Sequence, residues 1–195
     1  MKVIGLTGGT GSGKSIVCTQ LKKRNAYIID ADKIAHDIIK KGQPAYEKIV
    51  SYFGEEILDE ESNIVRKKLG AIVFSDKEKL DFLNKCTHQY ISEKINSFIQ
   101  TIKKCPNKYQ YIILDAPLLI ESNLTSICDE IWVVYAKEED RLKRIMQRDN
   151  ITYEQAKNRI LSQKRWEEYK KYADIIIDNS RDLKFLENQL NTLFM

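Results

Sequence analysis

The start of the chain constrains its fold more than any other stretch. An apolar run at residues 2–6 leads into a glycine-rich segment, and a helical pattern begins at Ile16. The segment reads Gly8-Gly9-Thr10-Gly11-Ser12-Gly13-Lys14-Ser15. It satisfies the P-loop pattern G-x-x-x-x-G-K-[ST] in the strand-then-helix context that the pattern requires. The alternative is a glycine-rich turn that binds no ligand, but such a turn would rarely match a pattern this long. The segment therefore predicts a phosphate-binding loop.

The residue types of this segment suit a nucleoside triphosphate. Glycines allow successive backbone N–H groups to turn inward around phosphate oxygens, and a helix N-terminus adds partial positive charge. Lys14 can reach the β- and γ-phosphates, and the Ser15 hydroxyl can bind Mg²⁺ between them. We therefore expect ATP with Mg²⁺ as the bound species, held by residues 8–15 and Ile16.

Composition limits the remaining possibilities. A length of 195 residues suits a single domain, 1–195, and the net charge of +4 is spread along the chain. That charge favours small anions and does not resemble a nucleic-acid-binding tail. The four cysteines show no metal or disulfide spacing. The chain opens with a strand pattern rather than a signal peptide, and no apolar run is long enough to span a membrane. We expect a cytoplasmic protein without nucleic-acid or membrane partners, a monomer or small homo-oligomer.

Hydrophobic periodicity predicts an α/β protein. Helical patterns follow the apolar segments at Ile16 to about Arg24, at Asp32 to about Lys40, at Lys137–Asp149, at Asn150–Tyr172 and from Leu183. Strands are expected in the apolar run before the glycines and at Ala26–Asp30, Tyr111–Asp115, Glu130–Tyr135 and Asp174–Asp178. Alternation of this kind implies a parallel sheet covered on both faces, with ligands beyond the carboxyl ends of the strands. Residues 44–108 show helical spacing without a good strand, and we expect them to form a helical insertion.

A pair of aspartates ends the second strand. Transfer of a phosphoryl group to an alcohol needs a carboxylate that orients the hydroxyl and takes its proton. Asp30 and Asp32 flank Ala31, and alternation lets only one of them face the phosphates. We expect Asp32 to be this base. The alternative is that Asp32 caps the following helix.

A third strand-end acid is Asp115, which follows an apolar run at residues 111–114. This is the setting of a Walker-B acid, which binds Mg²⁺ directly or through water. The alternative is an aspartate that caps the turn before Pro117.

Arginines line the helix after Tyr135. Arg141, Arg144 and Arg148 lie at i, i+3 and i+7, and Arg159 follows on the next helical stretch. In a kinase, a lid at residues 138–172 would bring such guanidinium groups onto the transferred phosphoryl group. A solvated face paired with neighbouring acids is the alternative.

Several segments together resemble the dephospho-coenzyme A kinases, P-loop kinases that phosphorylate the ribose 3′-hydroxyl of dephospho-coenzyme A with ATP. The similar segments are residues 4–15, Asp30-Ala31-Asp32-Lys33-Ile34-Ala35-His36, Arg66 to Phe74, Ala116-Pro117-Leu118-Leu119-Ile120-Glu121, Arg144, Arg148-Asp149, Arg159-Ile160, Gln163, Ala173-Asp174 and Asp178-Asn179. The resemblance covers nearly the whole chain. The signatures D-A-D-x-I-A and P-L-L-x-E are far more specific than the P-loop.

The resemblance implies a three-layer P-loop fold with a five-stranded parallel sheet, a helical acceptor-binding insertion and a helical lid. It implies that Asp32, Lys14 and Arg144 are catalytic. The implied acceptor-binding residues are Asp32, Arg66, Leu69, His88, Pro117 and Leu118. The implied nucleotide-binding residues include Arg148 and Arg159, and Ser15 and Asp115 would bind the metal.

Four positions depart from the family's usual pattern: Val65, Gln89, Arg141 and Tyr169. They concern the acceptor and lid segments rather than the phosphate-handling residues.

Two other functions share part of this evidence. Another P-loop kinase acting on a nucleoside, nucleotide or sugar would share the fold class. A GTP-dependent switch protein would carry a D-x-x-G switch and an N-K-x-D guanine reader. Residues 115–118 do not match the first, and residues 84–87 do not match the second.

Overall fold

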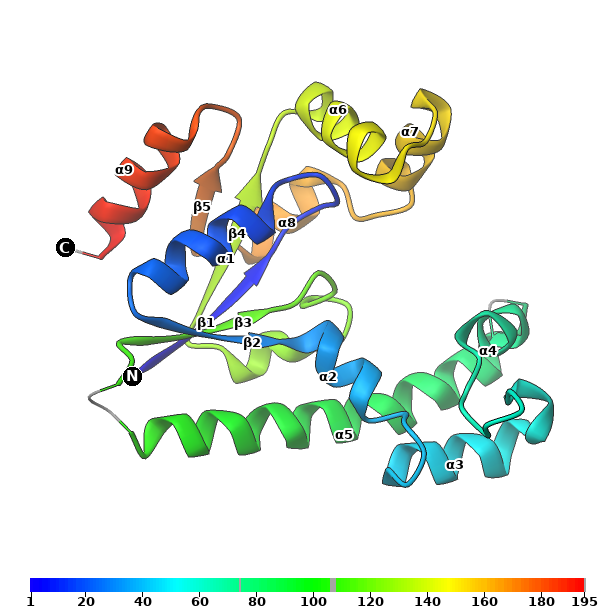
Figure 1. Ribbon diagram of the computed structural model, residues 1–195. Helices are drawn as coiled ribbons and strands as arrows, with labels where there is room; N and C mark the ends of the chain where they lie inside the picture. Colours follow the sequence, from blue (N-terminus) through cyan, green and yellow to red (C-terminus); the bar gives the residue numbers. More distant parts are fainter. Residues whose placement is uncertain (74, 106–107, 195) are drawn as a thin grey trace. The chain divides into compact units, whose positions relative to one another are not determined.

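A five-stranded sheet forms the centre of the computed structural model, which describes residues 1–73, 75–105 and 108–194 (Figure 1). The strands are β1 (Lys2–Thr7), β2 (Ala26–Asp30), β3 (Tyr111–Asp115), β4 (Glu130–Tyr135) and β5 (Ile175–Asp178). Their order in the parallel sheet is β2-β3-β1-β4-β5. The predicted α/β class and the five strands are confirmed. The last strand begins one residue later than expected.

The register brings the ends of the central strands together. In β1, Leu6 lies opposite Asp115 of β3 and opposite Trp132 of β4, and Tyr135 lies opposite Asp178 of β5. Because these strands run parallel, their carboxyl ends share one edge of the sheet. The loop after β1, the acid that ends β3 and the segments after β4 and β5 all start from this edge.

The helices are α1 (Lys14–Lys23), α2 (Ala31–Asp37), α3 (Pro44–Phe53), α4 (Arg66–Val73), α5 (Lys77–Lys103), α6 (Glu138–Asp149), α7 (Tyr153–Leu161), α8 (Trp166–Tyr172) and α9 (Leu183–Leu193), with short 3₁₀ turns η1 (Glu55–Ile57) and η2 (Leu124–Ile127). The predicted helical stretch 150–172 is two helices rather than one. Thr152 and Gln155 form a capping box that starts α7, and Glu168 accepts from the backbone N–H of Arg165 at the start of α8.

The chain divides into two compact units. Unit 1 comprises Met1–Ile29 and Thr101–Met195, and unit 2 comprises Asp30–Gln100. Unit 1 contains almost all of the sheet, whereas the named elements of unit 2 are helical from Ala31 onward. The predicted insertion at 44–108 overlaps unit 2, and the predicted lid at 138–172 lies in unit 1.

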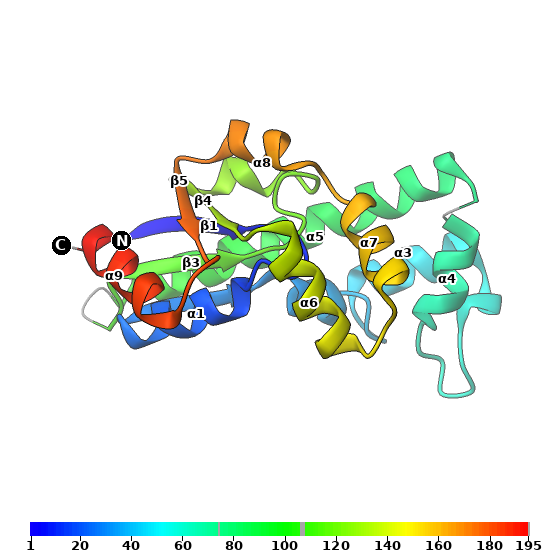
Figure 2. The ribbon, with the colours of Figure 1, turned by 90° about the horizontal axis from the view of Figure 1, so that it is seen from above.

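Alternation along β1 divides the core of unit 1 between the two faces of the sheet. Ile4 and Leu6 belong to a buried cluster with α1 and α9, which lie on the same face (Figure 2). Between them, Gly5 faces the other side, where a Cβ would meet Leu119 and Cys128 at 2.7 Å. That face carries α8 and the segment after β3, so helical layers cover both sides of the sheet.

Aromatic stacking joins helices α3 and α5 of unit 2. Tyr52 at the end of α3 stacks on Phe82 of α5 with ring centroids 3.7 Å apart, and Phe53 meets Phe82 edge-on at 5.9 Å. A bridge between Leu58 and Ile64 closes the loop between them. Val65 donates its backbone N–H to Ile57 at 2.8 Å. This frame fixes where α4 begins.

Truncation of a core leucine on α9 should destabilise the protein. Leu190 is fully buried in the cluster beneath the sheet, whereas Leu183 on the same helix is 50% exposed. We expect Leu190→Ala to lower the free energy of unfolding by about 2–5 kcal/mol, as measured by urea denaturation. Leu183→Ala is the control and should cost far less. Equal losses in both variants would contradict this packing.

Candidate functional site

The loop between β1 and α1 has the backbone of a phosphate-binding turn. Gly13 caps α1 in the left-handed region with a φ of 90°, and its carbonyl accepts from the N–H groups of Ile16 and Val17. A Cβ at Gly13 would run into the side-chain amide of Asn179. Both the backbone conformation and the space therefore require glycine here.

Donors at the start of α1 are open to an anion. Among the described residues of unit 1, no acceptor pairs with the backbone N–H groups of Gly13, Lys14 or Ser15. Unpaired N–H groups at a helix N-terminus, beside a lysine, bind phosphate oxygens favourably. This part of the predicted nucleotide site therefore fits a phosphate chain.

Side chains from α6 and from the residue after β5 hold the carbonyl groups of the loop. Arg141 donates from Nε to the Thr10 carbonyl at 2.9 Å. Arg144 donates from Nη1 to the Gly11 and Ser12 carbonyls at 3.3 Å each. The buried Asn179 amide also donates to the Ser12 carbonyl, at 2.8 Å. Because the C=O and N–H of a trans peptide point in opposite directions, holding these carbonyls on one side turns the N–H groups of the same peptides toward the other side of the loop.

Arg144 links three segments at the edge of the sheet. Besides its contacts with the loop, it donates from Nη2 to the Asn179 carbonyl at 2.8 Å. Asn179 in turn donates its backbone N–H to Tyr135, the last residue of β4. The guanidinium therefore supports the loop, and its predicted action on the transferred phosphoryl group stays a prediction.

Thr10 is held through both of its backbone groups. Its carbonyl accepts from Arg141, and its N–H donates to Gln163 Oε1 at 2.7 Å. Two buried polar atoms beside these contacts, Arg141 Nη2 and Ser12 Oγ, have no hydrogen-bond partner among the described residues. Burial lowers the pKa of Arg141, and Tyr169 opposes this shift through its charge interaction. Two positions that depart from the family pattern thus interact with each other.

The strand-end acid of β3 pairs with the P-loop lysine. Lys14 Nζ forms an ion pair with Asp115 Oδ1. Cys18 Sγ donates to the other carboxylate oxygen at 3.3 Å. Burial, followed by the charge of Asp115, raises the pKa of the Cys18 thiol to about 12, so the thiol stays a donor. Asp115 and Ser15 carry hard oxygen atoms of the kind that Mg²⁺ prefers, and their metal-binding role stays a prediction.

The segment after β3 is tied to the end of β1. Thr7 donates its hydroxyl to the Pro117 carbonyl at 3.1 Å, and the Leu6 carbonyl accepts from the Ala116 N–H at 3.1 Å. Leu118 is 56% exposed beside them. These bonds place Pro117 and Leu118 at the carboxyl edge of the sheet.

Two other predicted arginines share one carboxylate. Arg148 donates from Nε to Asp149 at 2.8 Å, and Arg159 pairs with the other oxygen of Asp149. The hydrogen bond from Arg148 is the main reason that the pKa of Asp149 is lowered. The shared carboxylate joins α6 to α7, and both guanidinium groups remain exposed.

In unit 2, the structure settles which aspartate caps α2. The helix begins at Ala31, and Asp30 is its N-cap, with Oδ1 accepting from the Lys33 N–H at 2.9 Å. The alternative that Asp32 caps the helix is therefore wrong, because Asp32 already lies inside the first turn. Its side chain is exposed.

The predicted acceptor-binding residues of unit 2 differ in environment. Arg66 is the first residue of α4, and its guanidinium contacts the imidazole of His36 on α2. Leu69 is buried, and burial lowers the pKa of the half-buried His88. Phe74, which ends the family-like segment of this unit, lies outside the described residues.

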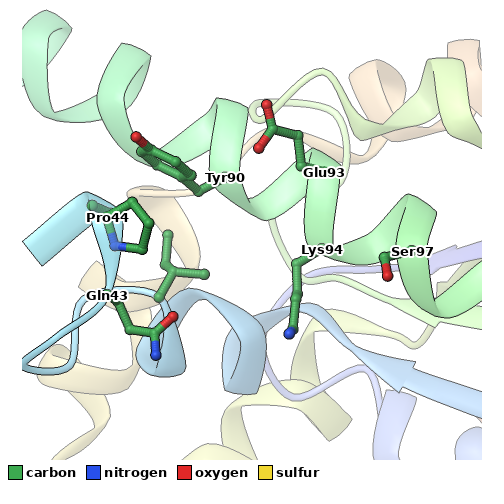
Figure 3. Close-up of a pocket in the computed structure, with 8 residues that line it drawn as sticks. Gln43, Pro44, Tyr90, Glu93, Lys94 and Ser97 are labelled. Carbon is green, nitrogen blue, oxygen red and sulfur yellow. The ribbon is translucent and has the colours of Figure 1, made fainter.

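A cavity of about 200 Å³ also lies in unit 2 (Figure 3). Eight residues line it: Ile38, Gln43, Pro44, Ala45, Tyr90, Glu93, Lys94 and Ser97. None of the predicted site residues is among them. The lining of the cavity therefore shares no residue with the predicted acceptor-binding set.

Sequence reasoning assigned no role to four residues that make these contacts: Asn179, Gln163, Cys18 and His36. Asn179, Gln163 and His36 lie in segments similar to the family, so the sequence contained a signal for them. Cys18 follows Lys14 by one helical turn, which was the available signal for its contact with the same carboxylate.

Comparison with known families gives a match along most of the chain. The family model described as dephospho-CoA kinase matches residues 2–184. A dephospho-CoA kinase of Carboxydothermus hydrogenoformans is 45% identical, over 99% of this chain and 93% of that protein. One from Arabidopsis thaliana is 38% identical, over 100% of this chain and 83% of that protein.

Solved structures agree with the sequence matches. A dephospho-CoA kinase from Campylobacter jejuni superposes with a TM-score of 0.72 at 35% identity, covering 98% of this chain and 94% of that one. The protein TT1252 from Thermus thermophilus gives a TM-score of 0.84 at 26% identity, covering 99% and 96%. A shikimate kinase from Acinetobacter baumannii, at 14% identity and a TM-score of 0.53, shares the fold alone. In the part of the chain that the structure describes, no helix is long and apolar enough to cross a membrane.

Loss of the Asn179 side chain should weaken nucleotide binding. Asn179→Ala removes a buried donor from the Ser12 carbonyl and leaves the loop less preorganised. We expect the Kd of a non-hydrolysable ATP analogue to rise about tenfold, as measured by titration calorimetry. Asn188→Ala, at an exposed position on α9, is the matched control. An unchanged Kd in Asn179→Ala would show that the amide does not organise the loop.

Proposed function

The chain belongs to the dephospho-CoA kinase family and transfers the γ-phosphate of ATP to the ribose 3′-hydroxyl of dephospho-CoA, and on that premise we propose the roles of its residues. The products are CoA and ADP, so this is the last step of CoA synthesis. The relatives' names do not favour another small-molecule kinase or a GTP-dependent switch. The observation that carries the residue assignment is the loop at residues 8–13, whose carbonyls are held by Arg141, Arg144 and Asn179.

The triphosphate binds on the donors at the start of α1. The N–H groups of Gly13, Lys14 and Ser15 face the phosphate oxygens, and Lys14 exchanges its contact with Asp115 for the β- and γ-phosphates. The support is the absence of acceptors for these N–H groups among the described residues of unit 1. The full nucleotide set is Gly8, Gly9, Thr10, Gly11, Ser12, Gly13, Lys14, Ser15, Ile16, Arg148 and Arg159.

Asp32 accepts the proton of the 3′-hydroxyl as that oxygen attacks the γ-phosphorus. Two observations support this role: Asp30 already caps α2, and the Asp32 side chain is exposed on the first turn. Lys14 and Arg144 offset the charge of the transferred group. Closure of a lid at residues 138–172 then excludes water, which would otherwise hydrolyse ATP.

The metal ligands are the Ser15 hydroxyl and the Asp115 carboxylate. Mg²⁺ keeps several waters and binds one or two protein oxygens together with substrate phosphates. The described residues contain no cluster of three or more His, Cys, Asp or Glu that could hold a metal ion, which agrees with a site completed by the nucleotide. Mg²⁺ bound there neutralises charge on the β- and γ-phosphates.

The acceptor binds to Asp32 on α2, to residues of the helical insertion, 44–108, and to the segment after β3. The residues are Asp32, Arg66, Leu69, His88, Pro117 and Leu118. Arg66 supplies positive charge for the anionic substrate, and Leu118 is an exposed apolar contact.

The protein works in the cytoplasm as a monomer or small homo-oligomer. Four free thiols support this compartment, since a reducing environment preserves them.

Replacement of the proposed base tests the mechanism most directly. Asp32→Asn keeps the size of the side chain but cannot accept the proton, so kcat should fall by about 10²–10⁴-fold. ADP release with dephospho-CoA as acceptor measures kcat, and calorimetry should show nearly unchanged ATP binding. Asp30→Asn is the matched control, because asparagine also caps a helix. Near-normal turnover in Asp32→Asn, or collapse in Asp30→Asn alone, would reject Asp32 as the base.

The metal assignment predicts a changed Mg²⁺ requirement. Asp115→Asn removes one anionic ligand, so the Mg²⁺ concentration for half-maximal rate should rise about tenfold or more. Mg²⁺ titration at saturating ATP measures this concentration. Asp129→Asn, at an exposed position before β4, is the control. An unaltered Mg²⁺ requirement in Asp115→Asn would remove Asp115 from the metal site.

A further inference from the structure

A second residue on α2 lies on the same face as the proposed base. Asp32 and His36 are four residues apart in the helix Ala31–Asp37, so their side chains are neighbours, about one 5.4 Å turn apart. Both side chains are exposed. A ligand that contacts Asp32 and extends along the helix toward its C-terminus would therefore meet the imidazole next.

Arg66 reaches this position from another helix. It is the first residue of α4, 30 positions further along the chain, and its Nη1 contacts both ring nitrogens of His36, with Nη1 3.2 Å from Nδ1. A guanidinium can only donate hydrogen bonds. A hydrogen bond between the two side chains therefore uses a lone pair of the imidazole as its acceptor.

The chemistry of a nucleotide acceptor matches this row of three groups. The ribose carries its 3′-hydroxyl on one side of the ring and its 5′-diphosphate on the other. A carboxylate that takes the hydroxyl proton would also repel the diphosphate. A cation about one ribose ring from that carboxylate would offset this repulsion. Arg66 at His36 supplies such a cation, and a planar guanidinium binds phosphate oxygens in pairs.

We infer that His36 is a positioning residue, which holds the guanidinium of Arg66 toward the 5′-diphosphate of the acceptor whose 3′-hydroxyl Asp32 deprotonates. The inference rests on the proposed roles of Asp32 and Arg66. Histidine suits this task because a neutral imidazole orients the guanidinium without cancelling its charge. A carboxylate would neutralise Arg66, and a lysine would repel it.

Steady-state kinetics with both substrates test the inference. His36→Ala should raise the KM for dephospho-CoA about tenfold, because the guanidinium loses its support, while the KM for ATP stays within about twofold. His36→Gln, whose amide oxygen can accept from Arg66, should recover most of the affinity. His36→Lys, which places a like charge beside Arg66, should be worse than His36→Ala. Lys67→Ala, an exposed cation on the same helix as Arg66, is the matched control.

A double-mutant cycle tests whether His36 acts through Arg66. If it does, His36→Ala with Arg66→Ala should raise the KM for dephospho-CoA no further than Arg66→Ala alone. Calorimetric binding of dephospho-CoA and thermal melts of each variant separate affinity from folding. Additive effects, equal rises in both KM values, or no recovery in His36→Gln would overturn the inference. If Arg66→Ala binds dephospho-CoA normally, the proposed acceptor site itself fails. If Arg66→Ala is impaired and His36→Ala is not, only the role of His36 fails.

Discussion

The site of unit 1 depends on hydrogen bonds that fix the carbonyl side of one short loop. Two arginines of α6 and the asparagine after β5 donate to the carbonyls of Thr10, Gly11 and Ser12. A peptide whose carbonyl is fixed on one side has its N–H fixed on the other. The positive end of α1 and the loop therefore face the proposed position of the phosphate chain, which is the electrostatic preorganisation that phosphoryl transfer requires.

The same bonds couple the loop to the segments after β4 and β5. Arg144 contacts both the loop and Asn179, while Gln163 holds the N–H of Thr10 from the linker between α7 and α8. The predicted lid, residues 138–172, thus contains the side chains that shape the loop. Movement of α6 or of this linker would alter the phosphate site directly. Nucleotide binding and lid position are therefore expected to be linked.

Charge is arranged differently in the two units. In unit 1, Lys14 and Asp115 pair, and the neutral Cys18 thiol donates to the second oxygen of the carboxylate. In unit 2, the described hydrogen-bond contact of Arg66 is with an imidazole, which brings no negative charge against the guanidinium. The first arrangement pairs Lys14 with a carboxylate that a phosphate group would replace in the proposed mechanism. The second presents a cation beside the proposed base.

The sequence by itself determined the fold class, the bounds of most strands and the phosphate loop, because these follow from local patterns: apolar runs, glycines and the spacing of Lys14 and Ser15. It also placed Asp32 and Asp115 at strand ends. Only the tertiary structure decided that Asp30 rather than Asp32 caps α2, that Arg141 and Arg144 bind loop carbonyls, and that His36 meets Arg66. The cap is a local contact, but it depends on the residue at which α2 begins. The arginine and histidine contacts join residues far apart in the chain, so their geometry depends on how whole elements pack.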